Sequence, residues 1–111
     1  MSRPYELVMY SRTTPCAYVT IARGVLTKRG VPYRELFIDE QDTYRQRVLD
    51  WTGFLSVPTL IVVEPGGELP VEPPTLLPKG ASPRGVNRGS MITEATEPEL
   101  VAWLTQHGLL P

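Results

Sequence analysis

Short apolar segments alternate with amphipathic helical patterns over the first 63 residues of this chain. Residues 5–10, 33–38 and 59–63 are rich in Val, Leu, Ile, Phe and Tyr, which is typical of buried strands. Residues 17–29 and a second segment that ends near Trp51 instead repeat apolar residues at helical spacing. The order β-α-β-α-β predicts an α/β fold in which two helical crossovers connect parallel strands.

The predicted helix ends have clear chemical signals. Gly30 and Gly53 are expected to end the two helices, because glycine readily adopts the left-handed conformation that follows a helix. Asp39 or Asp42 can cap the second helix.

The remaining residues complete one domain, 1–111. Residues 64–88 contain six prolines and no sustained period, so we interpret them as a partly polyproline-like insertion. The insertion could act as a lid, a partner-docking arm or packing over an edge strand. Residues 90–93 predict a short strand antiparallel to the third, which makes the four-stranded sheet mixed. Thr96 and Glu99 form a capping box for a last helix ending at Gly108.

The amino-acid composition argues against several classes of partner and binding site. Eleven basic and twelve acidic residues nearly balance, so neither a nucleic acid nor an anionic membrane is indicated as a partner. A single cysteine excludes a disulfide within one chain, and we expect no metal site. Together with the lack of a signal peptide or an apolar run long enough to span a bilayer, this predicts a cytoplasmic protein.

Cys16 lies where the first apolar segment gives way to the first helical pattern. Thr14 is a suitable N-cap and Pro15 a suitable first helical residue, which would place Cys16 in the first turn. The free N–H groups of that turn, with Arg12 just upstream, favour a nucleophilic thiolate. The alternative is that Cys16 is merely a small buried apolar residue.

Val57-Pro58 precedes the third predicted strand. A cis bond before proline costs only about 0.5–1 kcal/mol over trans. It would turn the N–H and C=O of Val57 outward, as a pairing edge for an extended peptide beside Cys16. The alternative is a trans proline that simply begins a strand.

Three stretches resemble the glutaredoxin family. Residues 10–19 are similar to the aromatic, hydroxyl and basic lead-in to its Cys-Pro-Tyr-Cys site, and residues 51–59 to its Thr-Gly…Thr-Val-Pro segment with a cis proline. Residues 88–91 are more weakly similar to its Gly-Gly turn before the last helix. The resemblance implies a thioredoxin-like three-layer sandwich, β-α-β-α-β-β-α, acting as an oxidoreductase in redox homeostasis.

The resemblance also implies a mechanism. The family's second cysteine is Val19 here, so Cys16 would act in a monothiol cycle on glutathione mixed disulfides. Glutathione would be a cosubstrate, with no tightly bound cofactor. The implied partners are glutathione or glutathionylated proteins, and the implied state is a monomer or weak homodimer. The residues expected to bind the substrate are Arg12, Thr14, Tyr18, Val57, Pro58, Gly89 and Ser90.

The sequence also allows other interpretations of these residues and of the function. Arg12 could be a solvated charge and Tyr18 a packed ring. Two copies of Cys16 with two glutathione thiols could hold a [2Fe–2S] cluster at a dimer interface, because such clusters require four thiolates. Alternatively, the chain is a non-catalytic binding module that presents the Val57-Pro58 groove and the proline-rich arm to a partner.

Overall fold

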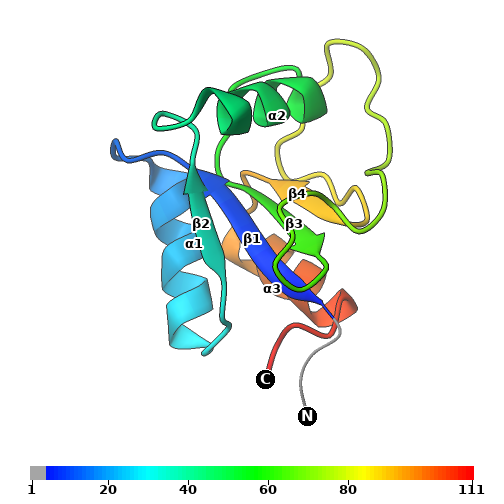
Figure 1. Ribbon diagram of the computed structural model, residues 1–111. Coiled ribbons are helices and arrows are strands. Elements are labelled where there is room, and N and C mark those ends of the chain that lie inside the picture. Colours follow the sequence, from blue (N-terminus) through cyan, green and yellow to red (C-terminus); the bar gives the residue numbers. More distant parts are fainter. Residues whose placement is uncertain (1–4) are drawn as a thin grey trace.

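The computed structural model describes residues 5–111, which form a four-stranded sheet and three helices (Figure 1). None of the helices in this range is long and apolar enough to cross a membrane. The elements in chain order are β1 (Glu6–Ser11), α1 (Ala17–Lys28), β2 (Arg34–Phe37), α2 (Asp42–Thr52), β3 (Thr59–Val63), β4 (Met91–Thr93) and α3 (Glu97–Gln106).

The strand order in the sheet is β2-β1-β3-β4. β1 and β2 are parallel, whereas β3 is antiparallel to β1 and β4 is antiparallel to β3. The mixed four-stranded sheet and the β3–β4 hairpin are therefore confirmed, and together with the helix order they form the predicted thioredoxin-like α/β fold.

The expectation that the second crossover also connects parallel strands is wrong. Tyr10, near the end of β1, pairs with Thr59 at the start of β3, so β3 begins at the end of the sheet where β1 finishes. The physical reason is the direction of α2, which lies across the strands rather than alongside them (Figure 1). The chain thus returns to the end of the sheet that it left after β2.

The helices cover both faces of the sheet. Leu7 and Met9 of β1 pack with α1 and α3, whereas Val8 and Tyr10 pack toward α2. Because adjacent side chains of this strand enter different cores, both of its faces are apolar, as expected for a central strand. Trp103 of α3 is fully buried in the first core.

The helix ends follow the expected chemistry with one shift. Gly30 follows the α1 cap and Gly53 caps α2, both with positive φ, and the Thr96–Glu99 capping box of α3 is formed. The N-cap of α2, however, is Gln41 rather than Asp39 or Asp42. Asp39 is not available for capping because its carboxylate accepts hydrogen bonds from the loop before α1.

Residues 64–88 contain no helix or strand, but they are fastened to the sheet (Figure 1). The Val71 N–H donates to the Val62 carbonyl of β3, and the Ser90 hydroxyl donates to the Glu72 carbonyl. Further along, Arg84 forms an isolated β-bridge with Thr93 of β4. The segment is therefore attached to the sheet at β3 and at the β4 edge, and between these points it forms a wide loop beside α2 (Figure 1).

Arg88 joins this segment to α2. Arg88 is only 4% exposed. Its Nε donates to the Thr75 carbonyl at 2.8 Å, and its Nη1 donates to the Trp51 carbonyl at 2.6 Å. Burial lowers the pKa of this guanidinium from its ordinary value. The Trp51 carbonyl belongs to the last turn of α2, where carbonyls lack helical partners and attract cations.

Replacing Arg88 is expected to destabilise the fold. Arg88→Ala leaves two carbonyls without their charged donor, which predicts a loss of about 2–4 kcal/mol in the free energy of unfolding, measured by urea denaturation. The free energy of unfolding of Arg88→Lys should lie between those of the unmodified protein and Arg88→Ala, because one ammonium cannot reproduce the guanidinium geometry. Arg45→Ala, at an exposed position of α2, is the matched control. Equal stability of the Arg88→Ala and control variants would refute the anchoring role.

Candidate active site

Cys16 occupies the N-cap position of α1, with extended backbone angles of φ −153° and ψ 126°. The expectation that Thr14 caps the helix is wrong, because α1 begins only at Ala17. Thr14 is exposed in the preceding loop. Cys16 itself is half-buried and packs against the core between the sheet and α2. The thiol is thus held at the helix start without being enclosed.

The loop before Cys16 is fixed by Asp39, which lies just beyond β2. The Thr13 N–H donates to the Asp39 carboxylate at 3.0 Å and 3.2 Å, and the Thr13 hydroxyl also donates to it. These bonds, with a smaller contribution from the nearby charge of Arg12, lower the pKa of Asp39 below its ordinary value. They also explain why the helix starts late: the backbone at Thr13 is committed to Asp39.

The Arg12 side chain bonds to the loop that leads to Cys16. Its Nη2 donates to the Pro15 carbonyl at 3.2 Å, so the guanidinium lies against the residue that precedes Cys16. Its Nε is shielded from solvent and has no hydrogen-bond partner among the residues described. The predicted cation upstream of the cysteine is therefore present in the structure.

The start of α1 offers unpaired donors to the thiol. Thr20 is the first residue of α1 whose N–H donates within the backbone, and its acceptor is the Cys16 carbonyl at 3.0 Å. In residues 5–111 the N–H groups of Ala17, Tyr18 and Val19 make no hydrogen bond, and the Cys16 side chain does not cap the helix. Such amides at a helix start favour an anionic group placed beside them.

Val57 lies directly opposite Cys16. The Cys16 Sγ is 3.7 Å from the Val57 carbonyl oxygen, to which the thiol donates. The Val57–Pro58 peptide bond is cis. In the described chain the Val57 N–H has no hydrogen-bond partner, so this backbone carries an open donor. Beneath it, the Thr59 hydroxyl lies 3.0 Å from the Thr93 hydroxyl and joins the two strands that support the turn.

Tyr18 is covered by a residue of the proline-rich segment. The guanidinium carbon of Arg84 lies 5.3 Å from the centre of the Tyr18 ring, within the range of a cation–π contact. Sequence reasoning missed Arg84, because nothing in an aperiodic segment indicates which of its side chains returns to the sheet. The half-buried Tyr18 ring, by contrast, was expected near Cys16.

The glutaredoxin family model matches residues 7–65, which is more than half of the chain. This chain belongs to the glutaredoxin family. Its fold agrees with two solved structures of buckwheat glutaredoxin, one a complex with glutathione and the other a mutated form. The complex is 19% identical with a TM-score of 0.53, and the match covers 96% of this chain and 83% of the buckwheat chain. The mutated form is 20% identical with a TM-score of 0.51, and the match covers 99% of this chain and 84% of the buckwheat chain. No curated protein matches the sequence.

Gly89 and Ser90, which we expected to bind substrate in this glutaredoxin, lie away from Cys16. The Ser90 carbonyl accepts from Val62, which pairs with Leu7 at the start of β1, whereas Cys16 follows the end of β1. The Gly89 carbonyl accepts from the Trp103 ring N–H instead. The turn that does lie near Cys16 contains Glu94, whose φ is 47°. Because that turn uses glutamate and not glycine, a search for paired glycines could not find it.

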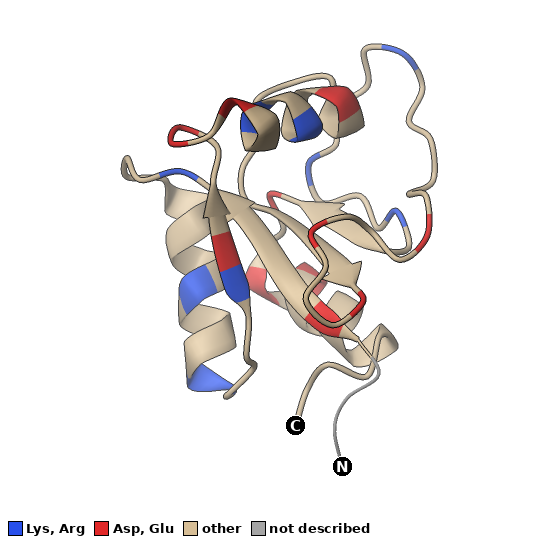
Figure 2. Cartoon of the chain, in the orientation of Figure 1, with Lys and Arg blue, Asp and Glu red and all other residues tan. Residues whose placement is uncertain are grey.

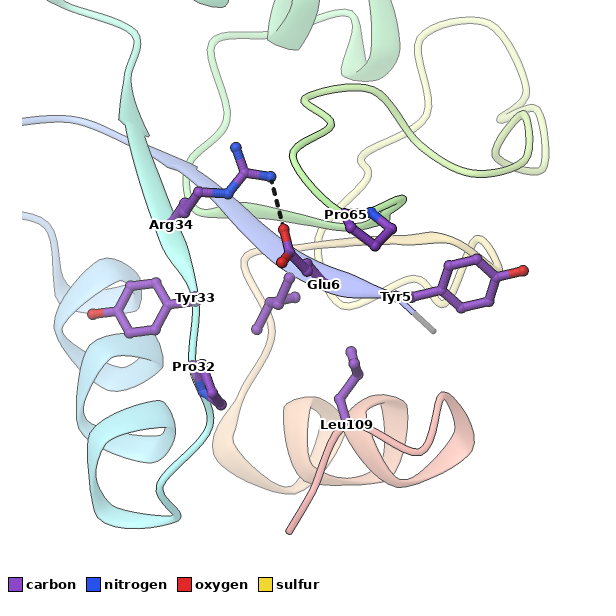
Figure 3. Close-up of a pocket in the computed structure, with 8 residues that line it drawn as sticks. Tyr5, Glu6, Pro32, Tyr33, Arg34, Pro65 and Leu109 are labelled. Atoms are coloured by element: carbon purple, nitrogen blue, oxygen red, sulfur yellow. Dashed lines mark hydrogen bonds and ion pairs between the residues drawn. The ribbon is translucent and has the colours of Figure 1, made fainter. Parts of the chain in front are cut away.

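A cavity of about 640 Å³ is lined by residues at the beginning of β1 (Figure 3), whereas Cys16 follows the end of that strand. It is found where β1 and β2 begin, and the Glu6–Arg34 ion pair spans 3.4 Å on its wall. Basic and acidic side chains are interspersed over the chain (Figure 2). In the part of the chain that is described, no three His, Cys, Asp or Glu side chains are grouped to hold a metal ion.

The Asp39 carboxylate should hold the loop before Cys16 until strongly acid pH. Because its folded pKa is lowered, its contribution to stability is complete above the ordinary value of 3.8 and is lost as the pH falls through the folded value. A carboxyl-carbon NMR titration should show the midpoint below 3.8, coupled to the Thr13 amide shift. Thr13→Val should raise the midpoint, whereas Thr43→Val, on α2, should not. An Asp39 midpoint that is insensitive to Thr13 would contradict this assignment.

Proposed function

We propose that this glutaredoxin-family protein is a thiol–disulfide oxidoreductase that uses Cys16 in a monothiol cycle on glutathione mixed disulfides. The observation that carries the proposal is the position of the Cys16 thiol. Cys16 is the N-cap residue of α1, directly before three unpaired helix amides, and its Sγ is 3.7 Å from the carbonyl of Val57, whose N–H is unpaired among the described residues. A structural cysteine has no need of either feature.

In the first step, the Cys16 thiolate attacks the glutathione sulfur of a mixed disulfide. A new Cys16–glutathione disulfide forms, the old S–S bond breaks, and the other thiol leaves as a thiolate. In the second step, the thiolate of free glutathione attacks the glutathione sulfur on Cys16. Oxidised glutathione leaves, and the Cys16 thiolate is regenerated. One free glutathione is consumed for each mixed disulfide that is reduced, and the other half of the oxidised glutathione comes from the mixed disulfide itself, so the electrons balance.

The residues around Cys16 are suited to hold glutathione, which is an extended peptide with two carboxylates. The Val57 N–H and C=O can pair with its backbone as a neighbouring strand would. Arg12 contributes a cation beside Pro15, and its shielded Nε still lacks an acceptor among the described residues. The glutathione complex of a buckwheat protein with this fold supports the choice of ligand.

The monothiol form of the cycle follows from the composition. Cys16 is the only cysteine in the sequence, so no second thiol of the same chain can resolve the mixed disulfide. The corresponding position, Val19, is 1% exposed and packs in the core. Release therefore has to come from a second thiol molecule. We propose glutathionylated proteins as substrates and the reducing cytoplasm as the setting.

Intact-mass measurement tests the proposed cycle directly. Oxidised glutathione should add one glutathionyl group to the protein, and reduced glutathione should then remove it. Cys16→Ser is expected to abolish both the adduct and the turnover, because it removes the nucleophile. Thr20→Ser, a mild change on the exposed face of α1, is the matched control and should keep both. Absence of any adduct on the unmodified protein, with slow alkylation at neutral pH, would rule out the oxidoreductase function.

A further inference from the structure

Arg84 reaches the rim of the Cys16 site from the long proline-rich segment. Starting from the thiol, the Cys16 Sγ contacts the Val57 carbonyl, and the adjacent Pro58 carbonyl accepts from the Glu94 N–H at 2.9 Å. The Glu94 carboxylate in turn accepts from Arg84 Nη2 at 3.1 Å. These contacts connect the guanidinium to the cysteine through one side of the site.

A second route returns from Arg84 to the cysteine. The guanidinium lies 5.3 Å from the centre of the Tyr18 ring, and Tyr18 is two residues after Cys16 in the first turn of α1. The two routes together form a closed ring of contacts that includes Val57, Pro58, Glu94, Arg84 and Tyr18. Arg84 is therefore on the same rim as the thiol.

The backbone at Arg84 is firmly placed. Arg84 forms a β-bridge with Thr93, and the next N–H, of Gly85, donates to the Thr93 carbonyl at 2.7 Å. Gly85 has a φ of 70°, and a side chain there would approach the Glu99 carboxylate of the α3 capping box to 2.7 Å. The positive φ favours glycine at this position, and the two hydrogen-bonded contacts with Thr93 fix the path of the chain past the rim.

The guanidinium nevertheless has unused binding capacity. The Arg84 side chain is 59% exposed, and within residues 5–111 its only hydrogen bond and ion pair are with Glu94. A guanidinium has five N–H donors in a planar fork that matches a carboxylate. Arg88, in the same segment, is by contrast buried and bonded to two carbonyls. Arg88 fastens the segment, whereas Arg84 is left open toward solvent.

We propose that Arg84 binds a carboxylate of the disulfide substrate and thereby selects anionic disulfides for reaction at Cys16. This inference rests on the proposed function. Arg84 takes no part in making or breaking bonds: the Cys16 thiolate forms the new S–S bond and the leaving thiolate carries away the electron pair. The long segment thus contributes a specificity residue to the site.

Two disulfides that differ in charge test the proposal. Oxidised glutathione carries carboxylates, whereas 2-hydroxyethyl disulfide is uncharged, and both leave a mass adduct on Cys16. In Arg84→Leu, the rate constant for adduct formation with oxidised glutathione should fall about tenfold, the loss expected for one charge-assisted contact. The rate with 2-hydroxyethyl disulfide should stay within about twofold. Arg84→Lys should recover part of the rate, and Arg45→Leu, on exposed α2, should change neither rate.

The outcomes separate this inference from the function on which it rests. An equal fall with both disulfides would mean that Arg84 only shapes the groove, and an unchanged rate with oxidised glutathione would mean that it binds nothing there. Either result overturns the carboxylate assignment while leaving the thiol chemistry intact. If the unmodified protein reacts with neither disulfide, the oxidoreductase function itself fails, and the role of Arg84 falls with it.

Discussion

The antiparallel pairing of β3 with β1 is the constraint on which the site depends. Because Tyr10 pairs with Thr59, β3 starts at the end of the sheet where β1 finishes, and the residues just before β3 meet those just after β1. This pairing brings Val57 to Cys16 across 41 residues of sequence, and the Sγ–carbonyl distance of 3.7 Å is its local result. A parallel β3 would have placed the Val57–Pro58 turn at the opposite end of the sheet.

The proline-rich segment extends the same end of the sheet. Its prolines restrict the backbone and remove donors, so it cannot form a further strand over its length, and it is fastened at separate points instead. Buried Arg88 joins it to the end of α2, and Gly85 brings it against the cap of α3. Just before these two attachment points, the β-bridge between Arg84 and Thr93 places Arg84 at the rim of the Cys16 site. An insertion that looks featureless in sequence therefore places a guanidinium against Tyr18, in the first turn of α1.

Signals carried by neighbouring residues predicted much of this fold. Features that depend on residues distant in the sequence were not predicted. The β3 run, Gly53 and the Thr96 capping box were correctly located because each is decided by neighbouring residues. The direction of β3 was not, since it depends on how α2 crosses the sheet. The start of α1 was misplaced because Asp39, distant in sequence, holds Thr13. Gly89 and Ser90 were expected near Cys16, whereas the residue that hydrogen-bonds to Pro58, next to Val57, is Glu94, which has no sequence signal for its positive φ.

Each basic side chain near Cys16 has a carboxylate close to it, which limits how much its positive charge could favour a Cys16 thiolate. Arg12 lies close enough to Asp39 to lower the pKa of that carboxyl, and Arg84 is paired with Glu94 at 3.1 Å. Each cation therefore shares its field with a carboxylate, and the net charge at the rim is small. The unpaired amides at the start of α1 have no such opposing partner among the described residues. If Cys16 reacts as the proposed function requires, these helix amides are therefore better placed to favour an anion there than the two arginines, whose positive charge is shared with carboxylates.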